Sequence, residues 1–308
     1  MRTIAAVLAC GLALAGCGLG EGAQRKGGGA ELRVTRDFGR VELGEAKLAK
    51  VREGSTVMRF LRSRFKITTR FGGGFVQSIN GLEGGGEGGR LDWFFWVNGI
   101  ESSVGAADYA LSPGDHVQWD RRDWSATMTV PAIVGAFPEP FLHGTKGKRP
   151  PVRVECDDPG RGPCAEVKRR LERLGVSTSS STVGAPGTEK VLRVVVAPWK
   201  EARLVSAAAA LEKGPGQSGV FARFAADGSS LSLLDENGKP ARRVLPGAGT
   251  GIVAATQDAR GDAVWLVTAL DSKGLATAAH TLDASKLRNA FAVAATGRVV
   301  EKLPLAKR

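Results

Sequence analysis

The residues best suited to hold a ligand lie in a run of four consecutive aromatic side chains, Trp93-Phe94-Phe95-Trp96. The run is typical of a β-strand, on which successive side chains point to opposite faces. Phe94 and Trp96 then share one face with Asn98, while Trp93 and Phe95 point into the core. Aromatic rings beside an amide offer stacking area and orienting hydrogen bonds, which suits a flat amphipathic ligand. We therefore predict a ligand-binding face here.

Two other segments could frame this face or close it. A glycine triplet at 72–74 adjoins predicted strands, where glycine permits close backbone approach. The loop at 100–113 carries Tyr109 and could instead pack over Phe94 and Trp96, making them core residues. The sequence leaves both alternatives open. The candidate ligand-binding residues are Phe94, Trp96, Asn98, Tyr109, Gly73, Gly74 and Phe75.

The sequence offers no recognisable catalytic motif. The histidines are His116, His143 and His280, and they form no two-histidine metal motif. His116 follows Asp115 on a predicted strand with no nucleophile nearby, so we expect it at the surface. Ser218 lacks the pattern of a nucleophile elbow. We therefore expect a binding protein that requires no metal or cofactor, with an enzyme in the second half as a weaker alternative.

The first residues predict export and a lipid anchor. Residues 4–16 form an uncharged apolar run that is shorter than the roughly 20 residues needed to span a bilayer. Its length is typical of a signal peptide. It ends in Leu14-Ala15-Gly16-Cys17, which resembles the lipobox of bacterial lipoprotein precursors. The resemblance implies cleavage before Cys17 and its lipidation, anchoring the chain to the outer face of the cytoplasmic membrane. The alternative is an ordinary secretory signal.

Two further cysteines, Cys156 and Cys164, flank the turn-rich segment DDPGRGP. An even number of remaining cysteines in an exported protein favours a disulfide between them. A metal or redox pair is the alternative, but no other cysteine or nearby histidine supports it. We therefore predict a disulfide.

The charge of the chain lies in its second half. Residues 31–143 contain 14 Lys and Arg against 14 Asp and Glu, whereas residues 144–308 contain 26 against 16. The basic residues are scattered and form no stripe along a helix, so no specific nucleic-acid partner is expected. Anionic cell-wall polymers or lipid head groups are better candidates, and a solvated basic surface is the simplest interpretation.

Composition divides the chain into five segments. A Gly-rich stretch and a stretch rich in Pro, Gly, Lys and Arg are typical of a tether and a linker. We predict a signal peptide at 1–16, a tether at 17–30, a first domain at 31–137, a linker at 138–151 and a second domain at 152–308.

The first domain begins with two predicted strands, a helix from Val57 and further strands. It resembles the transcobalamin-C-terminal-like domain of bacterial surface proteins, a β-grasp type of domain that often has no assigned function. The resemblance covers about residues 31–130, including FGGGFVQSINGLEGG and DWFFWVNGIESSVGAADYALSPGDHVQWDRRDW. In animal cobalamin carriers, the similar domain caps the corrin ring against a helical barrel that is absent here.

The resemblance implies a cobalamin-like or other planar ligand that is passed to an uptake system. It also implies a transporter or a helical-barrel protein as partner. The alternative is an envelope lipoprotein that uses the same face for protein–protein assembly and binds no small molecule.

The second domain is predicted to be α+β with a mixed sheet. The apolar run at 191–197 is typical of a central strand. Helices are predicted at 200–212 and at 274–292, the latter ending in FAVAA. Several strands lie between them, two of which are joined by an Asn237-Gly238 hairpin. The whole chain is therefore predicted to be α+β, and residues 152–308 resemble no family that we recognise.

Overall fold

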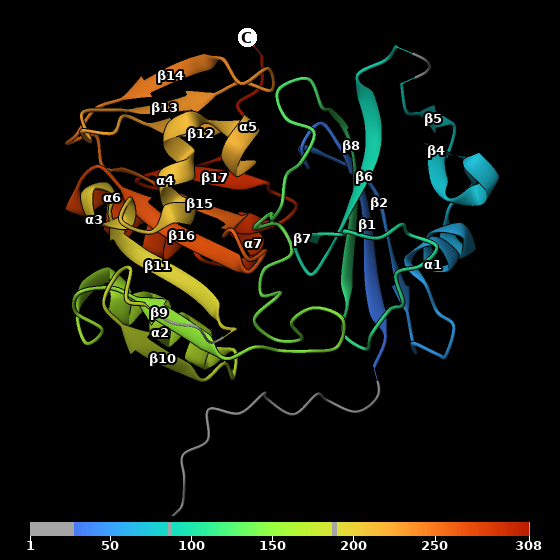
Figure 1. Ribbon diagram of the computed structural model, residues 1–308, viewed down its shortest axis with the longest axis horizontal. Coiled ribbons are helices and arrows are strands. Elements are labelled where there is room, and N and C mark those ends of the chain that lie inside the picture. Colours follow the sequence, from blue (N-terminus) through green and yellow to red (C-terminus); the bar gives the residue numbers. More distant parts are fainter. Residues whose placement is uncertain (1–27, 86–87, 187–189, 308) are drawn as a thin grey trace, which may run out of the picture.

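The structure of the protein is a computed structural model that describes residues 28–85, 88–186 and 190–307. Cys17 and the predicted signal peptide lie outside these residues. The fold is α+β, as predicted, with one half of the chain built on each of two large sheets (Figure 1). Within the described residues, no helix is long and apolar enough to cross a membrane.

The first half contains a five-stranded sheet in the order β2-β1-β8-β6-β7. The central strands β1 and β8 run parallel and the other neighbours run antiparallel, which is a β-grasp arrangement. The strands are β1 (Ala30–Arg36), β2 (Val41–Leu48), β6 (Leu91–Val97), β7 (Ile100–Glu101) and β8 (His116–Asp123).

One face of this sheet is covered by helix α1 (Val57–Arg64). Thr56 caps the start of the helix, because its hydroxyl accepts a hydrogen bond from the Arg59 backbone N–H at 3.2 Å. Its apolar residues pack with Trp93 and Trp119 from the sheet, as the strand alternation predicted. Burial of this face supplies the hydrophobic stabilisation that a short helix lacks on its own.

The glycine triplet lies in a small sheet apart from the C-terminal half. This sheet contains β3 (Ile67–Arg70), β4 (Phe75–Ile79) and β5 (Leu82–Glu83), and a 3-10 turn at Phe71–Gly73 joins its first two strands. Figure 1 shows β4 and β5 on the side of the five-stranded sheet away from the second half.

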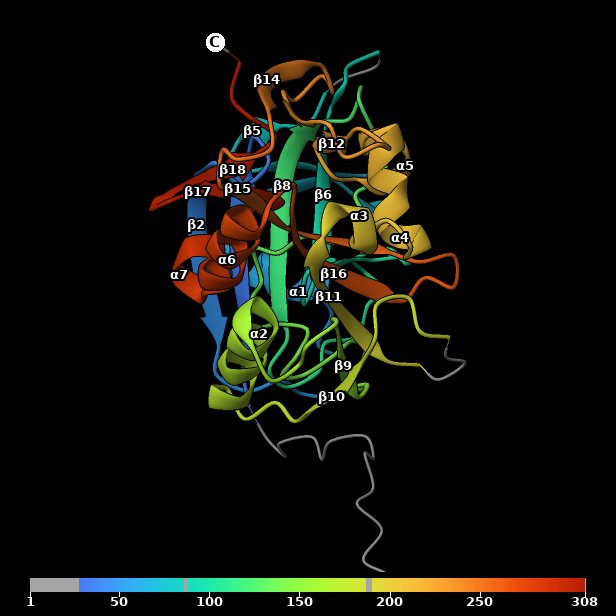
Figure 2. The same cartoon turned by 90° about the vertical axis from the view of Figure 1, so that its left-hand side faces the viewer.

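The second half is built on a mixed sheet in the order β10-β9-β11-β16-β15-β17-β18. Figure 2 shows α2, α6 and α7 on one side of this sheet and α3, α4 and α5 on the other. Its strands are β9 (Val152–Glu155), β10 (Thr178–Ser181), β11 (Leu192–Pro198), β15 (Thr250–Gln257), β16 (Ala263–Ala269), β17 (Ala292–Thr296) and β18 (Val299–Leu303).

The remaining elements pack around this sheet, and a three-stranded antiparallel sheet adjoins it. The helices are α2 (Gly162–Arg173), α3 (Trp199–Ala202), α4 (Ser206–Ala209), the 3-10 helix η2 (Ala210–Lys213), α5 (Pro215–Ser218), α6 (Ser272–Thr281) and α7 (Ala284–Leu287). The small sheet contains β12 (Ala222–Phe224), β13 (Leu231–Leu234) and β14 (Pro240–Val244), and the predicted turn at Asn237-Gly238 joins its last two strands.

Two predicted helices are corrected by the structure. The segment 200–212 is broken into α3, α4 and η2 instead of forming one helix. The segment 274–292 ends as a helix well before its predicted end, because Asp283 begins a separate short helix by accepting a hydrogen bond from the Ser285 N–H at 3.0 Å. The FAVAA run enters β17 in the sheet, where its small apolar side chains are buried.

The predicted disulfide between Cys156 and Cys164 is present. It connects the end of β9 to the first turn of α2, and both cysteines are buried in the core beneath that helix.

The segment 124–151 runs between the two halves and is packed, although its second part has the composition of a linker (green in Figure 1). Val130, Ile133 and Phe141 are buried in it. Phe38 of the first half contacts Phe221 and Phe291 of the second, with ring centroids 4.9 and 5.3 Å apart. The two halves therefore share a hydrophobic core.

Candidate functional site

The strand register gathers the predicted aromatic face and polar residues of two more strands onto one surface. Trp96 of β6 lies opposite Gln118 of β8, and Gln118 lies opposite Arg33 of β1. Alternate residues share a face, so the surface extends in both directions along these strands. It comprises Phe94, Trp96, Asn98, His116, Gln118, Asp120, Glu31, Arg33 and Thr35.

Most of this surface is closed by the C-terminal half, not by the 100–113 loop. The Trp96 side chain is 0% exposed, and its Nε1–H donates a hydrogen bond to the Val130 carbonyl at 2.7 Å. Its ring meets the edge of Phe291 with centroids 5.0 Å apart. The predicted stacking role of Trp96 is therefore corrected, since its ring packs the two halves together.

Asn98 is also buried, and its side chain forms hydrogen bonds within the protein. Its Nδ2 donates to Asp115 Oδ1 at 2.9 Å and to the Gly144 carbonyl at 2.7 Å. Its Oδ1 accepts from the His116 backbone N–H at 2.7 Å. These bonds join the β6–β7 turn, the start of β8 and the connecting segment. Its amide is engaged within the protein, so the predicted contact between Asn98 and a ligand is corrected as well.

Phe94 is half-buried and lies beneath the guanidinium of Arg122, whose Cζ is 3.9 Å from the ring centroid. Arg122 also donates to the carbonyls of Thr127 and Met128 at 2.8 and 2.6 Å. Arg122 therefore connects the Phe94 ring, by a cation–π contact, to the chain that follows β8, by hydrogen bonds. The ring of Phe94 therefore has a partner within the protein.

The other predicted residues are not brought to Trp96. Tyr109 packs in the core beneath α1, with its ring edge towards Phe95 at 6.4 Å between centroids. Tyr109 and Phe94 both line a cavity of about 610 Å³ that also borders Glu101 and Met128. The hairpin that carries Gly73, Gly74 and Phe75 belongs to the small separate sheet and lines none of the cavities described here.

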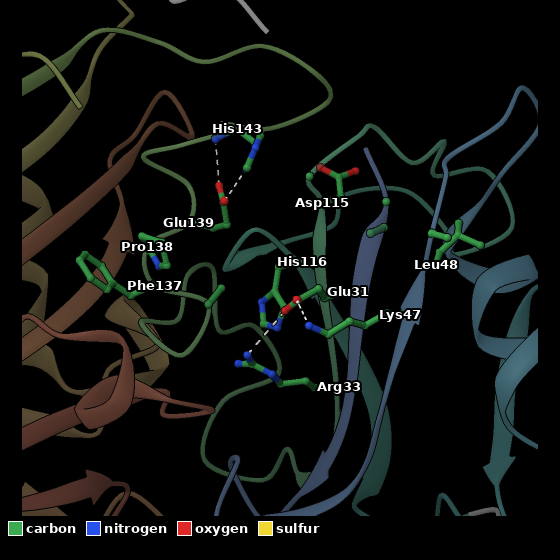
Figure 3. A pocket seen from close by; sticks show the side chains of 15 residues that line it. Glu31, Arg33, Lys47, Leu48, Asp115, His116, Phe137, Pro138, Glu139 and His143 are labelled. Atoms are coloured by element: carbon green, nitrogen blue, oxygen red, sulfur yellow. Dashed lines mark hydrogen bonds and ion pairs between the residues drawn. The ribbon is translucent and has the colours of Figure 1, made fainter. Parts of the chain in front are cut away.

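The surface remains open at one end, where a cavity of about 460 Å³ lies between the five-stranded sheet and the connecting segment 124–151. Figure 3 shows His116 beside Glu31 and above Arg33, with Glu139 and His143 on the facing segment. The lining residues are Gly29, Ala30, Glu31, Arg33, Lys47, Leu48, Ala49, Gly114, Asp115, His116, Ala136, Phe137, Pro138, Glu139 and His143.

His116 is the most unusual residue of this cavity. Its side chain is 6% exposed, and neither ring nitrogen has a hydrogen-bond partner within the described part of the chain. Burial, followed by the positive charges of Arg33 and Arg288, lowers the pKa of the ring to about 3. The ring is therefore neutral at physiological pH and offers one donor and one acceptor. A buried polar group normally has a partner, so this ring is a candidate ligand contact.

Arg33 also lines the cavity, and one of its N–H donors is unused within the described part of the chain. Its Nη1 donates to Asn289 Oδ1 at 3.5 Å, and its Nη2 is 3.8 Å from Glu31 Oε2. Its buried Nε has no partner among the described residues. Burial and the neighbouring Arg288 lower its pKa, but the guanidinium stays charged at neutral pH.

The acidic groups of the cavity are already engaged. Glu139 accepts from His143 twice, from Nδ1 at 2.6 Å and from the backbone N–H at 2.9 Å. Asp115 accepts from Asn98 and from the Ser112 backbone N–H, the latter at 2.7 Å. Burial raises the pKa of the Asp115 carboxyl to about 6. These two carboxylates therefore already accept hydrogen bonds from groups of the protein.

The arrangement suits binding more than catalysis. No group of three or more His, Cys, Asp or Glu side chains that could hold a metal occurs among residues 28–85, 88–186 and 190–307. The expectation that His116 lies at the surface is wrong, because its side chain is only 6% exposed. One signal in the sequence pointed to it: alternation placed His116 on the same face as Trp96.

Comparison with known proteins concerns the first half of the chain. Residues 54–122 match a family described as a domain of unknown function, DUF4430. A candidate metal-binding protein from Ruminococcus gnavus ATCC 29149 is similar in structure, with 12% identity and a TM-score of 0.25 over 31% of this chain and 97% of that chain. Haptocorrin in complex with Cbi is 19% identical, with a TM-score of 0.24 over 32% of this chain and 26% of haptocorrin. No curated protein matches the chain. The match to this family runs from just before α1 into β8.

Proposed function

We propose that the protein is an exported, lipid-anchored binding protein that holds a small polar molecule in the cavity between its five-stranded sheet and the connecting segment and presents it to an uptake system. The observation that carries this proposal is His116, a buried ring that lines the cavity and has no partner on either nitrogen among the described residues. Leaving such groups unpaired costs free energy that a ligand can recover.

The size and position of the cavity support the proposal. Its volume of about 460 Å³ lies within the roughly 300–1,000 Å³ of small-molecule sites. Its wall combines the apolar Leu48 and Phe137 with a few polar groups. The lipid anchor rests on the sequence around Cys17.

A more specific form of this proposal is that the ligand is cobalamin-like, as the family resemblance implies. Trp96 is covered, so a corrin ring would not stack on it without separation of the two halves. Cobalamin is included in the test because the family resemblance implies it.

The test measures thermal unfolding against cobalamin, other corrinoids and a panel of small carboxylates, amides and amines. At a hundred times its dissociation constant, a ligand stabilises the fold by about 2.7 kcal/mol. Ala49 is exposed and lines the cavity, so Ala49→Trp should block it and abolish the shift. Ala226, exposed on a distant turn, provides the matched control Ala226→Trp, which should keep the shift. A compound that stabilises both variants equally would place its site elsewhere and contradict the proposal.

A further inference from the structure

We propose that this cavity selects an oxyanion, a carboxylate or phosphate group of a small molecule, which Arg33 and His116 hold together, and that His116 takes up a proton as the anion binds. This inference rests on the proposed function and names the chemistry of its ligand.

The first argument is the balance of hydrogen-bonding groups. Each acidic side chain near His116 already has a cationic or amide partner inside the protein. Glu31 pairs with Lys47 at 3.0 Å, and Glu42 and Glu45 both pair with Arg288 at 2.9 Å. Glu139 and Asp115 are engaged as described above. Among the side chains that line the cavity, the buried polar atoms without a partner in the described part of the chain are the Arg33 Nε and the two ring nitrogens of His116.

The second argument is position. Glu31 and His116 are direct register partners on the parallel strands β1 and β8, and Arg33 lies two residues further along the same face of β1. His116 and Arg33 line the same cavity, and the charge of Arg33 is among the causes that lower the pKa of the His116 ring. One small group could therefore meet both. Two N–H donors on side chains that line one cavity favour an acceptor with negative charge.

The third argument concerns the proton. Neutral His116 offers only one N–H, whereas its charged form offers two. Charged groups of both signs surround it. They are Glu31 and Arg33 of β1, Glu42, Glu45 and Lys47 of β2, Asp115 just before β8, Glu139 and His143 of the connecting segment, and Arg288 after α7. In the free protein, burial and the cations Arg33 and Arg288 hold the ring neutral. An anion in contact with the ring adds the opposite charge and favours the protonated form.

Linkage then sets the direction of the pH dependence. If the bound state holds one proton more than the free state, affinity rises as the pH falls. The limit is about tenfold per pH unit for one proton. The effect should appear below neutral pH, where protons are available but carboxylate probes, with pKa values of about 4, stay ionised.

The experiment compares matched probes of nearly equal shape: acetate with acetamide, and benzoate with benzamide, with inorganic phosphate as a second source of oxyanion. Binding to the full chain is followed by calorimetry and by NMR of the histidine ring carbons between pH 5.5 and 7.5. The chain has three histidines, so the His116 signal is assigned by its loss in His116→Gln. The oxyanions should bind, the amides should not, and His116 should change from neutral to protonated when an anion binds at pH 5.5.

Single substitutions distinguish the contributions of Arg33 and His116 to anion binding. Arg33→Gln should weaken oxyanion binding about tenfold or more, the loss of one charged hydrogen bond. Arg36→Gln, on the same strand but the opposite face, should leave binding unchanged. His116→Gln should still bind the carboxylate probes, with a smaller pH dependence. What remains belongs to Asp115, which lines the same cavity and whose pKa is raised to about 6.

Three results would overturn the inference: binding of the amides as strongly as the acids, binding of an anion while His116 stays neutral, or an affinity that does not respond to Arg33→Gln. Should only neutral or cationic compounds bind, with Ala49→Trp blocking them, the proposed function would stand and the oxyanion inference would fail. A panel in which no compound of any class responds to Ala49→Trp would count against both.

Discussion

Asp115 and His116 are adjacent in the chain, and burial moves their pKa values in opposite directions. Burial raises the pKa of Asp115 to about 6 and, with the charges of Arg33 and Arg288, lowers that of His116 to about 3. Between about pH 4 and pH 6, folded Asp115 keeps a proton that the unfolded chain releases, so its contribution to stability falls as the pH rises. Folded His116 lacks a proton that the unfolded chain binds below about pH 6.5, so its contribution rises with pH.

Replacing His116 should change how the free energy of unfolding depends on pH. From pH 7.5 to pH 5, His116→Gln should gain about 2 kcal/mol of unfolding free energy relative to the wild type, because it removes a side chain that the unfolded state protonates and the folded state does not. Urea unfolding at the two pH values measures the difference. His280→Gln, at an exposed position on α6, is the control and should show no such change. An equal pH dependence of His116→Gln and the wild type would contradict the burial of a neutral ring.

At the scale of elements, the disulfide fixes the start of α2 where the helix has no side-chain cap. The preceding residue Arg161 provides no capping hydrogen bond, and Cys164 lies in the first turn. The bond closes a short loop between β9 and α2. It therefore restricts the unfolded chain and also holds a helix end that lacks the usual polar cap.

Cys156→Ser combined with Cys164→Ser should lower the free energy of unfolding by about 2–3 kcal/mol, the value expected for a loop of this length. Urea unfolding with and without a reducing agent provides the measurement. Reductant should destabilise the wild type by a similar amount and leave the double variant unchanged. A wild type that is insensitive to complete reduction would show that the bond does not stabilise the fold.

At the scale of the whole molecule, the two halves are joined by a turn that fits against the second half. The Asp120 carboxylate accepts hydrogen bonds from the Phe38 and Gly39 backbone N–H groups at 3.0 and 2.8 Å. Gly39 has a φ of 73°, and a side-chain carbon there would lie 1.6 Å from the Asn289 carbonyl oxygen. Only glycine fits this contact, which places Phe38 in the shared core.

We therefore expect the described chain to unfold in one cooperative transition, with the same midpoint by circular dichroism and by tryptophan fluorescence. Trp96→Ala should shift the whole transition by about 3–5 kcal/mol, the usual cost of removing a buried large aromatic residue. Phe71→Ala is the control, because Phe71 is 85% exposed, and should change stability little. Two separate transitions, with only one sensitive to Trp96→Ala, would contradict a shared core.

Local patterns in the sequence predicted much of the fold but little of the site. Alternation placed Trp93 in the core and Trp96 on the opposite face, because the period of a strand follows from its backbone. The partner of Trp96 is Phe291, nearly two hundred residues away, and no local pattern indicates that two sheets pack together there. His116 was expected at the surface for the same reason. The broken helix at 274–292 was also missed, since small apolar residues suit a buried strand as well as a helix.

Gly29 and Ala30, which line the cavity, are the last residues of the predicted tether, and β1 begins at Ala30. If Cys17 carries the lipid, about twelve residues separate the anchor from the cavity wall, a reach of at most about 40 Å. A captured molecule would then stay within a shallow layer above the bilayer and would meet a membrane receptor by lateral diffusion. Confinement of this kind raises the effective concentration of receptor and cargo. Transfer would then depend on surface density, and tension along the tether would act directly on the wall that holds the cargo.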